Sequence, residues 1–81
     1  MQARVYVTLK QGVLDPQGKA VARSLGTMGF DEVKDVRLGK FIELKLEDGS
    51  PEAARARIDE MCKRLLANTV IEDYRIEIIG A

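Results

Sequence analysis

The chain has no histidine, and only one of its 81 residues is a cysteine. A single cysteine allows no internal disulfide, and Cys62 without any histidine does not suit a zinc or iron–sulfur site. The usual general base of a hydrolase triad is also missing, and no pair of Asp or Glu residues is marked as catalytic. We therefore predict no catalytic, cofactor-binding or metal-binding residue, and we interpret Cys62 as inert packing.

An excess of charge of one sign is also lacking, since 13 basic residues balance 13 acidic ones. Nucleic acids and anionic membranes attract a net basic surface, so neither is an expected partner. Aromatic residues make up 5% of the chain, too few for the base-stacking platform of an RNA-recognition module. No apolar run approaches the roughly 20 residues of a membrane span, and the first residues do not resemble a signal peptide. We expect a cytoplasmic protein.

The chain is short, and its 81 residues leave room for one domain, residues 1–81. A chain of this size buries only about 60–65% of the surface that its unfolded form exposes. Small domains usually gain support from a disulfide, a metal or a partner subunit. Because the first two are excluded here, we predict that the chain forms oligomers.

Local signals predict a first strand and a first helix. Residues 4–10 alternate in polarity, which predicts a strand with one buried face. Asp15 is a good N-cap residue, and Pro16 suits the first helical position. Gly29 is placed to end this helix in a left-handed conformation, with Phe30 packing back in a Schellman motif. The alternative for residues 12–19 is an anion site with Lys19, but no Walker A pattern is present and Asp15 brings a negative charge there.

A second helix is predicted to start with Ser50 as its N-cap and Pro51 at its first position. Its apolar stripe, which we expect to face the core, consists of Ala54, Ile58, Met61 and Leu65. Asn68 is predicted to end the helix in a left-handed conformation. Residues 70–79 then alternate and predict a last strand.

Residues 33–46, between the two helices, are rich in strand-forming residues. A tight hairpin would need a turn at residues 37–40, but Leu38-Gly39 suits neither type I′ nor type II′. The alternative is one long, bent strand with Gly39 at a bulge, where it could take a positive φ. The whole pattern predicts an α+β fold with two helices on one face of an antiparallel sheet.

The other face of the predicted sheet is half polar and half apolar. It is either a solvated surface or an interface between subunits, and the marginal core favours the interface. The residues that we predict for this interface are Tyr6, Arg37, Leu38, Gly39, Lys40, Phe41, Glu43 and Lys45.

Particular residues also carry a resemblance to a known family. The two most specific blocks are Leu14-Asp15-Pro16-Gln17-Gly18 and Leu65-Leu66-Ala67-Asn68, joined by Lys10, Gly29-Phe30, Val36-Arg37, Gly39-Lys40 and Val70-Ile71-Glu72-Asp73-Tyr74 at matching positions. The chain resembles the PurS family, the small subunit of phosphoribosylformylglycinamidine (FGAM) synthase, over essentially its whole length. One departure is Thr69, where the family usually has proline, and it concerns the rigidity of that turn.

The resemblance implies a role in de novo purine biosynthesis. A glutaminase subunit releases ammonia, and a large synthetase subunit that uses ATP and Mg²⁺ attaches it to formylglycinamide ribonucleotide. The small subunit would bridge these two and assist ammonia transfer, with no catalytic residue and no cofactor of its own. The resemblance also implies dimers or tetramers and a long middle strand shared between subunits. The alternative hypothesis is a free-standing, oligomeric domain that senses a ligand.

Overall fold

The computed structural model describes residues 1–80, which form three strands and two helices in the order β-α-β-α-β. The elements are β1 (Gln2–Leu9), α1 (Pro16–Thr27), β2 (Gly39–Lys45), α2 (Pro51–Met61) with a π-helical turn η1 (Cys62–Leu66), and β3 (Glu72–Ile79). The sheet is antiparallel throughout, with the strand order β2-β1-β3. The predicted α+β class and element order are confirmed.

The core lies between β1 and α2. Because β1 alternates, Val5 and Val7 turn to one face of the sheet, where they are 0% and 1% exposed. Ile58 and Cys62 meet them from the α2 side and are also fully buried. The strand predicted over residues 4–10 is therefore confirmed, with its buried face as expected.

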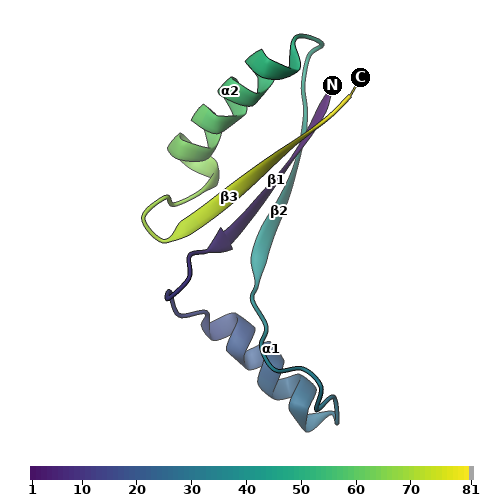
Figure 1. The fold of residues 1–81 in the computed structure, drawn as a ribbon, viewed down its shortest axis with the longest axis vertical. Coiled ribbons are helices and arrows are strands. Elements are labelled where there is room, and N and C mark those ends of the chain that lie inside the picture. The colour runs from purple at the N-terminus through teal and green to yellow at the C-terminus, as the bar shows by residue number, and fades with distance from the viewer. Residues whose placement is uncertain (81) are drawn as a thin grey trace.

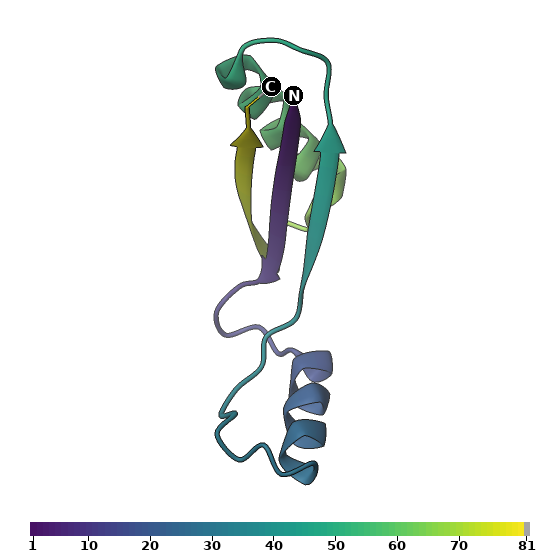
Figure 2. The same cartoon turned by 90° about the vertical axis from the view of Figure 1, so that its right-hand side faces the viewer.

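Only one of the two helices lies on the sheet. Figures 1 and 2 show α2 against one face, whereas α1 extends beyond the end of the sheet with the returning chain beside it. The described chain measures 48 × 27 × 14 Å, and its radius of gyration is 16.0 Å, against about 12 Å for a compact chain of this length. The prediction that both helices cover one face is wrong for a single chain.

The ends of α1 follow the sequence signals. Asp15 Oδ1 accepts a hydrogen bond from the backbone N–H of Gly18 at 2.8 Å. At the other end Gly29 has φ 96°, and the N–H of Phe30 donates to the carbonyl of Leu25 at 2.9 Å. The N–H of Gly29 donates to the carbonyl of Gly26 at 3.1 Å, which completes a Schellman motif. Both predicted ends of this helix are confirmed.

The start of α2 is confirmed and its end is not. Ser50 Oγ accepts from the N–H of Ala53 at 3.3 Å, as expected of an N-cap. After Met61 the helix widens into η1, which turns Leu65 to the surface, where it is 82% exposed. The prediction that Leu65 faces the core is therefore wrong. So is the left-handed cap at Asn68, because within residues 1–80 no residue other than glycine has a positive φ.

The middle stretch forms one strand rather than a hairpin. β2 begins at Gly39 and pairs with β1 in an unbroken register from Gly39 opposite Thr8 to Lys45 opposite Gln2. Residues 33–38 are not part of any strand, and Gly39 does not have a positive φ. The predictions of a long strand and of a bulge at Gly39 are thus wrong for the single chain. Gly39 is needed for another reason, since a Cβ there would overlap the carbonyl oxygen of Val7.

Candidate interaction surfaces

The face of the sheet opposite α2 is uncovered (Figure 2). An aromatic pair, Tyr6 and Phe41, lies on this face. The register places Tyr6 on β1 opposite Phe41 on β2 and Arg75 on β3. The two ring centroids are 5.2 Å apart, and the guanidinium carbon of Arg75 lies 4.1 Å from the centroid of the Tyr6 ring. Phe41 remains 54% exposed. This arrangement of rings and a cation is typical of a surface that is covered by a partner.

Polar side chains surround the aromatic pair on the same face. Arg4 Nη1 contacts Glu77 Oε1 at 3.2 Å, and Gln2 Nε2 donates to Glu43 at 3.2 Å. Within residues 1–80 the buried Nε of Arg4 lacks a hydrogen-bond partner. The surface is therefore mixed in charge.

The eight residues that we predicted for an interface fall into three groups. Tyr6, Gly39, Phe41, Glu43 and Lys45 lie together on this open face, because they occupy one side of the β1–β2 register. Lys40 pairs with Val7 and belongs to the opposite side. Arg37 and Leu38 precede β2, where Arg37 donates to the carbonyl oxygens of Leu9 and Lys10 at 2.8 and 3.2 Å. The role of all eight in an interface stays a prediction.

Asp15 joins the start of α1 to the segment that leads into β2, and we call this junction the elbow. Besides capping α1 through Gly18, it accepts a hydrogen bond from the N–H of Leu38 at 2.8 Å through Oδ2. The two N–H donors, that of Leu38 first, hold the pKa of this carboxyl below its ordinary value of 3.8, and the nearby Arg37 acts in the same direction. The sequence indicated the cap but not the second bond, because Leu38 is 23 residues away in the chain.

The hydrogen bond from Gly18 to Asp15 also bears on the alternative of an anion site over residues 12–19. The carboxylate of Asp15 occupies the N-terminus of α1, where an anion would have to sit. The capping interpretation is confirmed, and the position of the carboxylate disfavours the anion site.

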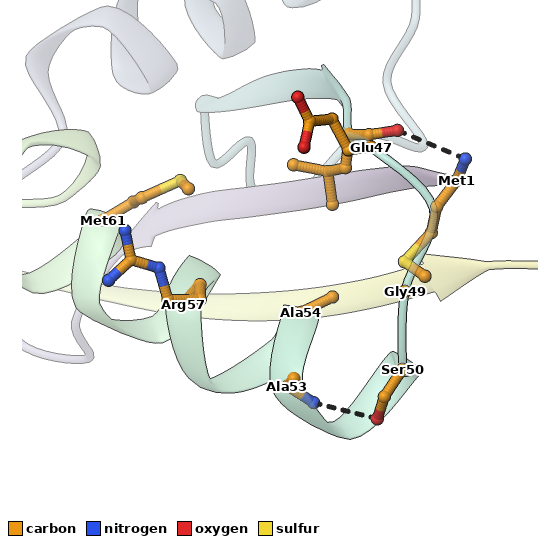
Figure 3. Close-up of a pocket in the computed structure, with 9 residues that line it drawn as sticks. Met1, Glu47, Gly49, Ser50, Ala53, Ala54, Arg57 and Met61 are labelled. Atoms are coloured by element: carbon orange, nitrogen blue, oxygen red, sulfur yellow. Dashed lines mark hydrogen bonds between the residues drawn. The ribbon is translucent and has the colours of Figure 1, made fainter.

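An apolar groove runs beside α2, on the face of the sheet that α2 covers (Figure 3). α2 packs along β3, which leaves room next to the β2 side of the sheet. The groove has a volume of about 310 Å³, and its apolar lining includes Met1, Leu46, Ala53, Ala54 and Met61. Arg57 and Glu47 stand at its margin. It is wide and shallow rather than enclosed, so it suits an apolar side-chain stripe better than a small ligand.

Cys62 lies beside a small polar network at the end of α2. The hydroxyl of Tyr74 donates to Asp59 at 2.5 Å, and Lys63 Nζ lies 2.9 Å from the same carboxylate. The Tyr74 hydroxyl, followed by Lys63, lowers the pKa of Asp59. Burial, with a smaller contribution from the Asp59 charge, raises the pKa of the fully buried Cys62 thiol. Cys62 therefore remains a protonated, packed thiol at neutral pH.

We accordingly expect Cys62 to react slowly with a thiol reagent in the native protein at neutral pH, because reaction requires the chain to open. The measurement is the labelling rate at pH 7, compared with the rate in denaturant, where full labelling within seconds to minutes is expected. Cys62→Ala should leave the function of the chain unchanged. Rapid native labelling together with loss of that function would contradict the packing interpretation.

Two further features are absent from residues 1–80. No group of three or more metal-ligating side chains comes together in this part of the chain. No helix in it is long and apolar enough to cross a bilayer.

Comparison with known families gives a match over nearly the whole chain. The family model for PurS, phosphoribosylformylglycinamidine (FGAM) synthase, covers residues 2–80. The chain belongs to the PurS family. The resemblance seen in the sequence is thereby confirmed.

Individual PurS relatives agree with this assignment. The FGAM synthase subunit PurS of Bacillus subtilis is 53% identical over 77 residues, covering 95% of this chain and 90% of the relative. The crystal structure of B. subtilis PurS superimposes with a TM-score of 0.84 at 54% identity and covers 94% of both chains. A structure of PurLQS from Thermotoga maritima contains a chain that matches with a TM-score of 0.86 at 33% identity, covering 94% of this chain and 93% of that one.

Proposed function

We propose that this PurS chain is a non-catalytic subunit of FGAM synthase in the cytoplasm, where it bridges the glutaminase and the ATP-dependent synthetase subunits and assists ammonia transfer. The observation that carries the proposal is the match, over 94% of this chain, to a chain in a PurLQS structure, which combines PurS with PurL and PurQ. In this proposal ATP and Mg²⁺ act on the synthetase subunit, and this chain binds no cofactor of its own.

The shape of the chain supports bridging. A bridge needs separate surfaces for separate partners, and an elongated chain of 48 Å offers them. Figures 1 and 2 show the uncovered sheet face, the helix α2 and the extended helix α1 on different parts of the molecule. The aromatic pair lies on that sheet face, and the groove lies beside α2. The buried, protonated thiol of Cys62 supports a role in binding rather than in catalysis.

A second copy of the chain is part of the proposal. The stripe of α1 contains Val21, Leu25 and Met28, and its outer members are 38% and 69% exposed, because no sheet lies under this helix. The groove beside α2 leaves room on the inner face of another copy's sheet. Placing the α1 stripe of one copy against the groove of another would bury both apolar surfaces.

The test of the bridging role is FGAM formation by the two partner subunits with and without this chain. We expect the glutamine-dependent rate to fall to near background when the chain is omitted, because ammonia then no longer passes efficiently between the partners. The rate driven by ammonium salts should persist, since it does not require the glutaminase. Equal glutamine-dependent rates in the absence of the chain would rule out bridging and return attention to the ligand-sensing alternative.

A further inference from the structure

The apolar stripe of α1 and the groove beside α2 are both open in the same chain. Met28, the last member of the stripe, is 69% exposed. Figure 1 shows α1 beyond the end of the sheet and away from α2, in a chain that extends over 48 Å. A chain with an open groove and an unpacked helix would bury apolar surface by folding that helix into its own groove. The structure nevertheless holds the two apart.

Chain length does not keep α1 from its own groove. Residues 10–15 connect β1 to α1, and residues 28–38 connect α1 to β2. An extended chain rises about 3.3 Å per residue and a helix about 1.5 Å, so the second connection can reach back over the full length of α1. It could then run along β2, which is an edge strand of the sheet. The closed arrangement, with both helices on one face of the chain's own sheet, is a common α+β solution.

The closed arrangement needs a turn that the structure replaces with a straight connection. A hairpin at residues 37–40 would direct the chain away from β1 and towards the outer edge of β2. Instead Arg37 donates to the carbonyl oxygens of Leu9 and Lys10 at 2.8 and 3.2 Å. Both acceptors lie at the end of β1, so the residues before Gly39 stay in line with β2 and beside β1.

The elbow ties the same segment to the start of α1. Asp15 accepts hydrogen bonds from the N–H of Leu38 and from that of Gly18, each at 2.8 Å. Gly18 is buried, and a Cβ there would overlap the carbonyl oxygen of Val36. The chain entering α1 and the chain leaving it are therefore packed directly against each other. α1 cannot turn back onto the sheet without breaking these contacts.

The sequence at this point opposes closure as well. Leu38-Gly39 suits neither of the tight hairpin turns, and Gly39 has no positive φ in the structure. A connection that disfavours its own turn promotes the exchange of an element between identical chains.

We propose that the elbow enforces the exchange of α1 between two copies of this chain, because it holds the helix off its own groove and leaves that groove to the helix of the other copy. The inference rests on the self-association in the proposed function and gives its cause. It implies that a chain supplied with a good turn at this point closes on itself and no longer needs a second copy.

The first test inserts an Asn-Gly dipeptide between Leu38 and Gly39, which supplies the type I′ turn that closure lacks. We expect the variant to sediment as a folded monomer, with a dimer dissociation constant at least about tenfold above that of the wild type. Isotope-filtered NMR contacts between the methyl groups of the α1 stripe and of Met61 in the groove should join two chains in the wild type and lie within one chain in the variant. The control has the same dipeptide between Asp31 and Glu32, in the exposed connection after α1, and its dissociation constant should stay within about twofold of the wild type.

A second variant keeps the length of the chain. Arg37→Gln removes the charged donor that holds the connection beside the end of β1, and it should raise the dissociation constant about tenfold. Lys34→Gln is its matched control, because it removes a positive charge from an exposed residue of the same connection. This control should stay within about twofold of the wild type.

The outcomes separate this inference from the proposed function, since none of these measurements requires a partner subunit. If the wild type is a dimer and both variants match their controls, the elbow does not enforce exchange, whereas self-association and bridging still stand. If the α1 contacts of the wild type lie within one chain, the helix fills its own groove and the inference fails, whatever the FGAM assay shows. If the insertion variant does not fold, Arg37→Gln decides, and an unchanged dissociation constant overturns the inference.

Discussion

Gly39→Val is expected to destabilise the protein by about 1–3 kcal/mol, although Gly39 lies on the surface and has an ordinary φ. A Cβ at this position would overlap the carbonyl oxygen of Val7 and lie 3.0 Å from the Thr8 methyl group. The carbonyl belongs to the central strand β1, which pairs on both sides and cannot shift without disturbing the whole sheet. The free energy of unfolding from denaturant titration is the measurement.

Gly80→Val is the matched control, because Gly80 follows the last strand and has open space where its Cβ would be. It should change stability by less than about 0.5 kcal/mol. Sedimentation of the wild type and Gly39→Val over a dilution series tests the proposed self-association at the same time. A Gly39→Val protein as stable as the control would show that the close approach of β1 and β2 is not limiting. A wild-type monomer that stays folded at low micromolar concentration would contradict an obligate dimer.

The parts of the fold that could be predicted rest on short-range chemistry. Asp15 and Ser50 accept hydrogen bonds from N–H groups three residues later, and Gly29 takes the left-handed conformation that only glycine adopts easily. The burial of Val5 and Val7 follows from the period of two along β1. Each of these signals lies within a few residues of its effect, so the sequence alone contains it.

The parts that were missed depend on contacts across the chain. The apolar stripe on α1 predicts that the helix buries one side, but it does not predict which surface covers that side. In the single chain Met28 remains 69% exposed. The stripe of α2 correctly predicted that Ile58 is buried, but the π turn that begins at Cys62 moves Leu65 to the surface. No residue type predicts such a turn. The need for glycine at residue 39 likewise arises from a strand 30 residues earlier, and it was attributed to the wrong cause.

For the candidate surfaces, the pattern on β1 and β2 was enough to bring Tyr6, Phe41, Glu43 and Lys45 to one face. It could not separate them from Arg37 and Leu38, whose contacts belong to the elbow. No pattern in the sequence indicates the groove beside α2, because Met1 and Met61 lie far apart in the chain. Surfaces formed by distant segments require the three-dimensional arrangement.

The second large effect on stability is expected from replacing Asp15 at the elbow. Asp15→Ala removes the acceptor for two backbone N–H groups, one at the start of α1 and one just before β2. We expect the melting temperature at pH 7 to fall by about 5–10 °C, because a helix cap is lost and the N–H of Leu38 is left without its partner. Hydrogen exchange should speed up most at the amides of Gly18 and Leu38. Asp31→Asn, which changes an exposed carboxylate in the connection that follows α1, is the control and should leave both measurements unchanged.

The stabilisation by Asp15 should depend on pH in a defined direction. Its pKa in the folded protein is lowered from the ordinary value of 3.8, so the unfolded chain binds the proton more readily than the folded one. The contribution is therefore complete above the ordinary value and is lost as the pH falls through the lowered pKa. The difference in melting temperature between the wild type and Asp15→Asn should accordingly be constant from about pH 5 to pH 7 and shrink below about pH 4. A difference that stays constant into acid would show that the carboxylate charge does not hold the elbow, and that the shape of the side chain alone suffices.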